Sequence, residues 1–492
     1  MQPSLPLDLT GIRIEPGRKR SGQLYVALRE LIIGTPQSSG CKLPASRGLA
    51  AMLEVSRNTV VNVYERLYSE GFVETRTGDG TYIADLRHGP VIGEDTSAPV
   101  EQQKLVGIRQ TSAAQFDHHP LHDGSPRAFR IGMPAIDQFP FEIWSRLQAR
   151  FWRRRPTVQM GYGDPAGDPQ LRYLIAHYLR NARGLKCDWS QILITSGAQQ
   201  AISLCSALLL RGNDEVVIEN PCYWAAAGAF SCVGAELRGI DVDEDGMVTS
   251  QLAGVHNARI AYVSPSCQYP TGATLSLTRR LELLHWAEKH QTWIIEDDYD
   301  GEYRYSGTPL MPLAALDRSN RVLYIGSFSK VMYPGLRLGY LVAPQQLIEQ
   351  LTLIRTMSDR QPPISDQVVM ASFIAEGHFQ QHIRRMRRAG LARRDALYSA
   401  WGQHLNHIGR MAEVSSGLHV LIRLASAERE HTLIKLAREA GIEITALSPL
   451  WLPGSKTVEG GRHGLILGFA GIPTPDICSA VIKLNSVWRD VG

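Results

Sequence analysis

Five short apolar runs recur after residue 190, and stretches with helical periodicity separate them. Buried parallel strands that alternate with helices give this rhythm, so the runs predict a mostly parallel sheet in an α/β fold. In sheets of this kind, ligands bind at the carboxyl ends of the strands. The runs are Ile192–Thr195, Glu215–Ile218, Ile260–Val263, Trp293–Glu296 and Val322–Ile325.

The loop after the last run carries the most specific chemistry. It holds Ser327, Lys330 and, seven positions after the lysine, Arg337. A strand that ends in small hydroxyl residues can place a lysine amine at an aldehyde and offer donors to a phosphate in the same loop. Ser-x-x-Lys alone is weak evidence, because it also occurs in acyl-transfer enzymes. Together with Arg337, the loop predicts a Schiff base between Lys330 and pyridoxal 5'-phosphate.

Turns after two earlier runs fit the same cofactor. Ser196, Ala198 and Gln199 lead into a helix, whose amino terminus favours a phosphate. Tyr223 follows the next run and is suited to stack on a flat ring.

The acidic residues 296–298 follow a strongly apolar run. Such a run of acids is commonly a solvated turn or a divalent-metal site, but its place directly after a buried strand favours a buried role. A buried carboxylate at Asp297 would keep a pyridinium nitrogen protonated and make the ring an electron sink.

Residues 20–86 show a different pattern, with three helical stretches followed by a short hairpin. Ser46 and Ser56 are expected to cap the second and third helices. Gly78-Asp79-Gly80 predicts the tight turn of the hairpin. The polar start of the third helix stands where a helix-turn-helix contacts base edges, although a solvated helix face would look the same.

Composition limits the remaining possibilities. The chain has 492 residues, 44% of them hydrophobic, which predicts two or three domains, and its net charge of +4 leaves a nucleic-acid partner open. Seven scattered cysteines without a Cys-x-x-Cys pair indicate neither a disulfide framework nor a zinc site, so no metal is expected. No stretch of about 18 apolar residues occurs, which predicts a cytoplasmic protein without a membrane partner.

Residues 87–126 are rich in Gly, Pro, Gln, Ser and His and are interpreted as a flexible tether. The histidines 118, 119 and 122 fit a polar linker better than a metal site, because no cysteine or carboxylate pattern completes one. The expected domains are therefore 20–86, the tether 87–126, and 127–492.

The first of these domains resembles the winged helix-turn-helix of GntR-type bacterial regulators. The resemblance runs through Leu43–Ala50, Val55–Val60, Tyr64–Val73 and Gly78–Tyr82. It implies binding to double-stranded promoter DNA, chiefly through Arg47, Arg57 and Thr59. The full set of implied DNA-binding residues is Lys42, Ser46, Arg47, Ser56, Arg57, Asn58, Thr59, Arg76 and Thr81.

Residues 127–492 resemble the fold-type I aminotransferases. The matching motifs are Tyr162–Gly167, Ser196–Gln199, Pro270–Gly272, Asp297-x-Tyr299 and Ser327–Lys330. The resemblance implies a mostly parallel sheet with a smaller C-terminal α+β lobe. It makes Lys330 the Schiff-base lysine, Asp297 the partner of the pyridine nitrogen, and Tyr299 a donor to the 3-oxygen. By the same resemblance, Tyr223 stands at the position that stacks on the cofactor ring, and Tyr162 at the position where a neighbouring subunit reaches in. The phosphate-binding positions are Ser196, Ala198, Gln199, Ser327 and Arg337.

The whole chain thus resembles the MocR subfamily of transcription regulators, in which a homodimer that exchanges its DNA-binding heads is expected. Two departures from the aminotransferase pattern matter. Tyr269 replaces the asparagine before Pro-Thr-Gly, and Gln268 is the candidate substitute for its contact with the cofactor. Ile466 stands where an arginine would grip an α-carboxylate, so efficient transamination of ordinary amino acids is not expected.

The leading hypothesis is a transcription regulator that binds promoter DNA and senses a small amine, an amino acid or a vitamin B6 compound through Lys330. The main alternative is a working aminotransferase with an accessory DNA-binding head. A third possibility is a dimerisation scaffold that no longer binds cofactor. The basic stretch Gln380–Arg394 is interpreted as a connecting helix, with a second DNA contact as the alternative.

Overall fold

The computed structural model describes residues 7–15, 19–35, 38–85, 127–154, 157–306, 310–455, 461–489 and 491. The chain divides into two compact units, residues 1–106 and 107–492. The predicted tether, with its three histidines, lies outside the described residues. No helix in the described ranges is long and apolar enough to cross a membrane. The same ranges hold no group of three or more His, Cys, Asp or Glu side chains placed to hold a metal ion.

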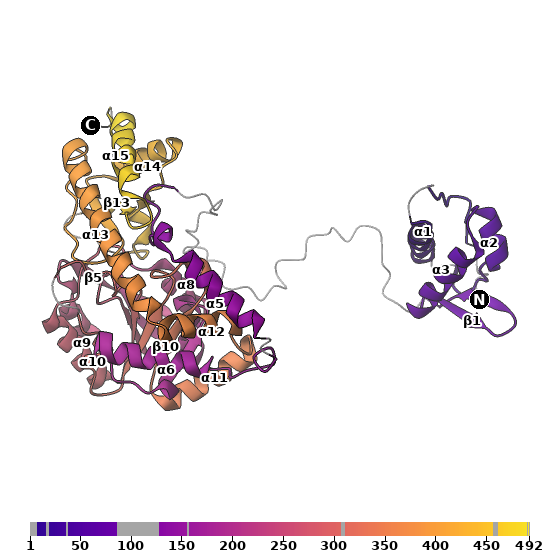
Figure 1. The fold of residues 1–492 in the computed structure, drawn as a ribbon, viewed down its shortest axis with the longest axis horizontal. Helices are drawn as coiled ribbons and strands as arrows, with labels where there is room; N and C mark the ends of the chain where they lie inside the picture. Colours follow the sequence, from indigo (N-terminus) through magenta and orange to yellow (C-terminus); the bar gives the residue numbers. More distant parts are fainter. Residues whose placement is uncertain are drawn as a thin grey trace. The chain divides into compact units, whose positions relative to one another are not determined.

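The N-terminal unit contains three helices and a hairpin, as the sequence predicts (Figure 1). The elements are α1 (Arg20–Gly34), α2 (Ser46–Met52), α3 (Arg57–Ser69), β1 (Val73–Arg76) and β2 (Gly80–Ile83). Apolar side chains at helical spacing meet the inward side of the hairpin and form one core. Its fully buried members include Leu24, Leu28, Ile32, Leu49, Val60, Val63, Leu67, Val73 and Ile83.

The expected helix caps differ in outcome. Ser56 caps α3, because its Oγ accepts a hydrogen bond from the Thr59 amide at 3.0 Å. The prediction for Ser46 is wrong. Ser46 is the first residue of α2, the cap position is Ala45, and no side chain caps this helix. The Ser46 hydroxyl instead accepts from Arg57 Nε at 3.4 Å, which links the starts of the two helices.

An eight-stranded sheet forms the centre of the larger unit. Its spatial order is β3-β10-β9-β8-β7-β4-β5-β6. The five predicted apolar runs are β3, β4, β7, β8 and β9, and all strand pairs from β9 across to β5 are parallel. The strands are β3 (Ile192–Thr195), β4 (Glu215–Asn220), β5 (Glu236–Asp243), β6 (Gly246–Met247), β7 (Ile260–Val263), β8 (Trp293–Asp298), β9 (Val322–Ser327) and β10 (Gly339–Val342).

Strand β10 was not predicted. It lies antiparallel between β3 and β9, with Gly339 opposite both Thr195 and Ser327. Because β10 pairs with both strands, the turn that follows β3 lies next to the loop that follows β9. Two predicted turns, around residues 196–199 and 327–337, therefore lie beside each other.

Helices cover the central sheet and lead into it. They are α5 (Phe141–Arg153), α6 (Pro169–Tyr178), α7 (Ala198–Leu209), α8 (Trp224–Cys232), α9 (Leu277–His290), α10 (Leu313–Leu316), α11 (Gln345–Ser358) and α12 (Ile364–Ala375). Short segments of other helix types occur at Ile136–Gln138, Leu179–Arg183, Trp189–Gln191, Thr249–Gly254, Pro334–Leu336 and Ser448–Leu450. The fold is α/β, as predicted.

The smaller C-terminal lobe is an antiparallel sheet covered by helices, as expected. Its strand order is β11-β13-β12, so β13 is central. Helix α13 runs from α12 to the C-terminal helix α15 (Figure 1), and Trp401 and Trp488 pack there with ring centroids 6.1 Å apart. The elements are α13 (His378–His404), β11 (His419–Leu424), α14 (Ala427–Glu439), β12 (Thr445–Ala446), β13 (His463–Gly468) and α15 (Thr474–Trp488).

Candidate cofactor pocket and DNA-binding face

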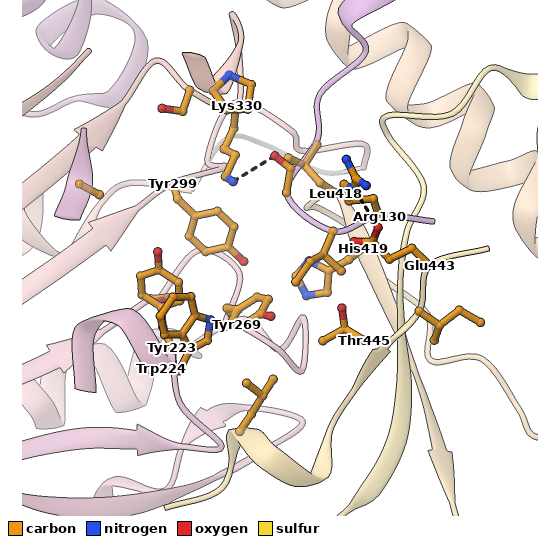
Figure 2. Close-up of a pocket in the computed structure, with 18 of the residues that line it drawn as sticks. Arg130, Tyr223, Trp224, Tyr269, Tyr299, Lys330, Leu418, His419, Glu443 and Thr445 are labelled. Atoms are coloured by element: carbon orange, nitrogen blue, oxygen red, sulfur yellow. Dashed lines mark hydrogen bonds and ion pairs between the residues drawn. The ribbon is translucent and has the colours of Figure 1, made fainter. Parts of the chain in front are cut away.

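A cavity of about 870 Å³ lies at the carboxyl ends of β8 and β9 (Figure 2). Side chains from the central sheet, the C-terminal lobe and the segment 127–132 line it. Eight of the eleven predicted cofactor residues meet there, although they are spread between positions 198 and 337 of the sequence. They are Ala198, Gln199, Tyr223, Asp297, Tyr299, Ser327, Lys330 and Arg337.

Asp297 is the buried carboxylate that the sequence predicts. Its Oδ2 accepts a hydrogen bond from the Tyr262 hydroxyl at 2.6 Å. Burial raises the pKa of Asp297 to about 6, and the Tyr262 hydrogen bond acts in the opposite direction. Within the described ranges Oδ1 has no hydrogen-bond partner. A buried acceptor without a partner is costly, so this oxygen is suited to a donor from a ligand.

Lys330 follows β9 and points into the same cavity. Its Nζ donates to the carbonyl oxygen of Gly132 at 3.0 Å, while the Tyr303 hydroxyl holds the Lys330 carbonyl at 2.8 Å. Burial lowers the pKa of the Lys330 amine, which increases the fraction of the neutral, nucleophilic form. Tyr299 lies opposite Lys330 in Figure 2. Among the described residues its buried hydroxyl has no hydrogen-bond partner.

The start of α7 and the guanidinium of Arg337 form a cationic end of the cavity. Helix α7 begins at Ala198 after Gly197, whose φ is 95°. Arg337 donates to the Ser196 carbonyl at 2.6 Å, and a Cβ at position 197 would meet its guanidinium at 3.3 Å. A helix amino terminus and an arginine together suit a phosphate.

Tyr223 belongs to an aromatic wall. Its ring centroid lies 5.9 Å from that of Tyr269, and Tyr269 lies 5.4 Å from His419, in both cases near edge-to-face. Burial raises the pKa of Tyr223 to about 12 and lowers that of His419 to about 4, so both are neutral near pH 7. Trp224 continues the wall beside Tyr223 (Figure 2).

Three predicted cofactor residues do not line the cavity. Ser196 acts through its backbone, because its carbonyl holds Arg337. Gln268 lies in its own loop, and its expected contact with the cofactor stays a prediction. Its amide donates to the carbonyls of Pro221 and Tyr269 and accepts from Thr271, which uses its hydrogen-bonding capacity in the loop. Tyr162 is 82% exposed, and its expected contact from a neighbouring subunit stays a prediction.

Sequence reasoning missed several lining residues. Tyr262 holds Asp297, and its hydroxyl inside an otherwise apolar run was the only available signal. Arg130 and Glu443 pair at 2.9 Å across 313 positions of sequence, a contact that no local pattern reveals. Ile466 is fully buried in β13, packed with Leu421 and its neighbours, and does not line the cavity.

The predicted DNA-binding residues gather around the starts of α2 and α3 and the hairpin. Arg47, Arg57 and Asn58 are exposed, whereas Thr59 is half-buried and bonded to the Ser56 hydroxyl at 2.8 Å. Arg57 is held near Ser46 by the hydrogen bond between the two helices. These positions leave two arginines accessible to nucleic acid.

On the hairpin side of this face, the charged side chains contact other residues of the N-terminal unit. Lys42 Nζ lies 2.7 Å from Asp79, whose other oxygen accepts from the Tyr82 hydroxyl at 2.5 Å. The guanidinium of Arg76 lies 4.1 Å from the centre of the Tyr82 ring. Thr81 is half-buried, and its carbonyl accepts from the Leu43 amide.

Some arginines of the basic helix α13 form hydrogen bonds and an ion pair within the protein. Arg387 donates to the Glu302 carbonyl at 2.9 Å, and Arg393 to the Ala470 carbonyl at 2.5 Å and to Asp137 at 2.6 Å. These contacts connect the central sheet region to the C-terminal lobe. They support the interpretation of α13 as a connecting helix.

The fold and the pocket together define a domain of the kind found in pyridoxal-phosphate-dependent enzymes, in one chain with a helix-turn-helix unit. Comparisons with known proteins support both assignments. Residues 153–456 match the family model "Aminotransferase class I and II". Residues 20–83 match "Bacterial regulatory proteins, gntR family". LysN, an α-aminoadipate aminotransferase from Thermus thermophilus solved with N-(5'-phosphopyridoxyl)-L-leucine, has a TM-score of 0.68 and 27% identity, covering 74% of this chain and 92% of that chain.

Full-length relatives place both parts in one protein. The probable rhizopine catabolism regulatory protein MocR of Rhizobium meliloti is 33% identical over 466 residues, which are 95% of this chain and 93% of the relative. The pyridoxine biosynthesis transcriptional regulator PdxR of Corynebacterium glutamicum is 32% identical over 450 residues, 91% of each. The chain therefore belongs to the MocR group of GntR-type transcription regulators.

Proposed function

We propose that this regulator binds pyridoxal 5'-phosphate through Lys330 and that a small amine, amino acid or vitamin B6 compound in the same cavity alters promoter binding by the N-terminal unit. The observation that carries the proposal is a set of buried polar atoms on one cavity. Asp297 Oδ1, the Tyr299 hydroxyl and Gln199 Oε1 have no hydrogen-bond partner among the described residues. Native proteins rarely leave such groups unsatisfied, so a polar ligand is expected to complete them.

The chemistry of these residues fits the cofactor. Asp297 Oδ1 can accept a hydrogen bond from the protonated ring nitrogen, and the Tyr299 hydroxyl can donate one to the oxygen on the ring. Tyr223 offers a neutral aromatic face, while Arg337 and the start of α7 suit the phosphate. When bound, pyridoxal phosphate supplies an aldehyde for amines and a conjugated ring that withdraws electrons.

Sensing fits the cavity better than turnover of ordinary amino acids. At the position expected to hold an α-carboxylate, Ile466 is fully buried among Leu421, Leu447 and Leu450. A carboxylate there would lose water without gaining a charged partner. An amino acid held only by its amine would not be oriented for proton abstraction.

The segment next to the tether offers a link between ligand and DNA-binding unit. Gly132 accepts the Lys330 hydrogen bond, and the same segment is hydrogen-bonded to the C-terminal lobe through Phe129 with Gly468 and Ala128 with Glu443. A ligand that engages Lys330 removes the hydrogen bond to Gly132. We infer that this change shifts how residues 127–132 sit and, across a homodimer with exchanged heads, which half-site arrangement is favoured.

The test is absorbance of the purified full-length protein titrated with pyridoxal phosphate. Wild type should gain a near-visible band, and Lys330→Ala should not. Lys289→Ala removes an exposed lysine of α9 and serves as the matched control. A wild type that stays colourless when saturated with cofactor would contradict the proposal and favour the scaffold alternative.

A second measurement separates regulator from enzyme. Keto-acid release from a panel of α-amino acids should be far below ordinary enzyme turnover, which is typically about 1–1000 per second. Promoter binding, measured in the same preparation, should respond to at least one amine or B6 compound. Turnover in the enzymatic range would instead support an aminotransferase with an accessory DNA-binding unit.

A further inference from the structure

The carbonyl oxygen of Val331, directly after Lys330, is held by a side chain from helix α13. Val331 is buried, and Nε2 of His382 lies 2.8 Å from its carbonyl oxygen, across 51 positions of sequence. Among the described residues no other donor reaches this oxygen. Because a buried carbonyl without a partner is costly, the hydrogen bond from His382 fixes the orientation of this peptide group.

The two partners of His382 determine where its ring proton lies. A carbonyl oxygen can only accept a hydrogen bond, so Nε2 carries the proton. The other ring nitrogen, Nδ1, accepts from the Arg385 guanidinium at 3.2 Å, three positions along α13. Burial lowers the pKa of His382 to about 4, and the charge of Arg385 acts in the same direction. His382 is therefore a neutral donor with one defined tautomer at pH 7.

Aromatic side chains fix the plane of the His382 ring, which is fully buried. Its centroid lies 5.9 Å from that of Phe139 and 6.2 Å from that of Phe373, in both cases near edge-to-face. Phe139 also packs on Tyr333, in the loop of Lys330, with centroids 5.1 Å apart. A ring enclosed in this way is held in one rotamer, so the donor is preorganised.

A second side chain holds the neighbouring carbonyl. The Tyr303 hydroxyl donates to the Lys330 carbonyl at 2.8 Å. Helix α13 is also fixed to the segment of Tyr303, because Arg387 donates to the Glu302 carbonyl at 2.9 Å. Two consecutive carbonyls, those of residues 330 and 331, are thus held by side chains from two connected parts of the fold.

A fixed backbone matters here because the lysine side chain is long and flexible. Reacting groups have to be held within about 0.5 Å and 10–20° of their productive geometry. A tilt of the backbone at Lys330 is amplified along its side chain, and a misplacement of about 1 Å can slow a reaction about 100-fold. His382 is absent from the described residues that line the cavity, so it can act on the cofactor only through Lys330.

We propose that His382 is a positioning residue, which aims the Lys330 amine at the aldehyde of the cofactor by holding the Val331 carbonyl. Arg385 fixes the ring tautomer that this hydrogen bond requires. The inference rests on the proposed function of Lys330 and adds a residue of α13 to it. It gives the basic stretch Gln380–Arg394 a role beyond the connection of the two lobes.

The test uses full-length protein freed of cofactor and mixed rapidly with excess pyridoxal phosphate. The rate at which the near-visible band appears, and the affinity, report on the Lys330 amine. Borohydride reduction followed by mass spectrometry locates the bond at Lys330. Urea unfolding of each cofactor-free variant measures stability separately, so that a loss of stability is not mistaken for a loss of positioning.

Substitutions at His382 separate its hydrogen bond from its packing. His382→Phe keeps a ring between Phe139 and Phe373 but removes the donor, and should slow band formation about 10- to 100-fold. His382→Gln should recover most of the wild-type rate, because its amide nitrogen is as many bonds from Cα as Nε2 is. His382→Asn has a shorter amide and should stay slow, and it replaces the Phe variant if that variant does not fold. Arg384→Gln, at an exposed neighbour on α13, is the matched control and should react as wild type does.

Two further variants address the partners. Arg385→Met leaves Nδ1 without its donor and should slow band formation less than His382→Phe does. Tyr303→Phe removes the hydrogen bond to the Lys330 carbonyl and should slow it as well. These effects should appear in the rate even where urea unfolding is unchanged.

The outcomes distinguish this inference from the proposed function. If wild type forms no band, the proposed function fails and the role of His382 fails with it. If wild type reacts but His382→Phe and His382→Asn react at the same rate, only the role of His382 is overturned, whatever happens to stability. Equal slowing in His382→Gln and His382→Asn would also contradict the proposal, because it would show that the packing of the ring matters and its hydrogen bond does not.

Discussion

Tyr262 donates a hydrogen bond to one oxygen of Asp297 at 2.6 Å, and among the described residues the other oxygen has no partner. Both side chains are buried. The hydrogen bond lowers the pKa of Asp297, whereas burial raises it to about 6. Tyr262 therefore helps to keep this carboxylate ionised at neutral pH, which is the state that can pair with a protonated ring nitrogen.

Tyr262→Phe should weaken cofactor binding and shift its pH dependence. Loss of the hydrogen bond raises the pKa of Asp297 above about 6, so the ionised form disappears at a higher pH. Loss of a hydrogen bond to a charged group costs about 1.5–3 kcal/mol, which corresponds to about 10- to 150-fold in affinity. Titrations of pyridoxal phosphate between pH 5.5 and 8 measure both effects. An unchanged affinity and pH midpoint would show that Tyr262 does not support Asp297.

Asp297→Asn should stabilise the cofactor-free protein at neutral pH while weakening cofactor binding. Because the folded-state pKa is raised from 3.8 to about 6, the native carboxyl loses stability as pH rises through this interval. The loss amounts to about 3 kcal/mol by pH 7. Urea unfolding of cofactor-free protein should show the gain at pH 7.5 and a smaller one at pH 5.5. Asp243→Asn, at a carboxyl whose pKa is lowered by Arg279, should give no gain.

Ile466→Arg should destabilise the protein rather than create a carboxylate site. Ile466 is fully buried in the central strand β13, opposite Leu421 and Thr445. An unpaired charge buried there should cost about 3 kcal/mol or more, whereas Ile466→Val should cost about 0.5–1.5 kcal/mol. Urea unfolding measures both. A stable variant that turns over α-amino acids would mean that this position alone controls the reaction.

Arg57→Ala should weaken promoter binding. Arg57 is exposed at the start of α3 and is held beside Ser46. If Arg57 contacts a base, its loss should cost about 1–3 kcal/mol on the specific promoter sequence. If Arg57 contacts a phosphate, its loss should weaken binding to all DNA and reduce the salt dependence by about one released ion. Fluorescence anisotropy at several salt concentrations separates these cases. Arg66→Ala, at the other end of α3, is the control, and equal affinity in wild type and Arg57→Ala would remove Arg57 from the DNA-binding face.

Asp79→Asn should strengthen DNA binding at low salt. Asp79 now pairs with Lys42 at 2.7 Å, and both side chains are about half exposed. The substitution removes a negative charge from the hairpin and frees Lys42 for phosphate. The gain, measured on promoter and unrelated DNA, should be similar for both and should vanish at high salt. If affinity falls instead, Asp79 orders the hairpin more than it restrains Lys42.

Local patterns were sufficient for much of the fold and the centre of the site. The apolar runs that became β3, β4, β7, β8 and β9 are periodic signals that short windows contain, and the carboxyl-end rule placed Asp297 and Lys330 on one edge. Strand β10 was missed, because four residues directly after the loop of Arg337 carry no separate signal. The wrong cap at Ser46 arose because a serine beside a helix start is also suited to a side-chain contact.

The amino-acid sequence by itself determined the two-part organisation, the central strands and the lysine that anchors the proposed site, because these depend on local periodicity and on motifs of a few residues. Only the tertiary structure decided how the site is completed. Tyr262 reaches Asp297 from a neighbouring strand, Gln268 turns into its own loop, and Arg130 meets Glu443 across 313 positions. Such contacts depend on how distant elements pack, and packing brings together residues whose separation in sequence carries no information about their distance in space.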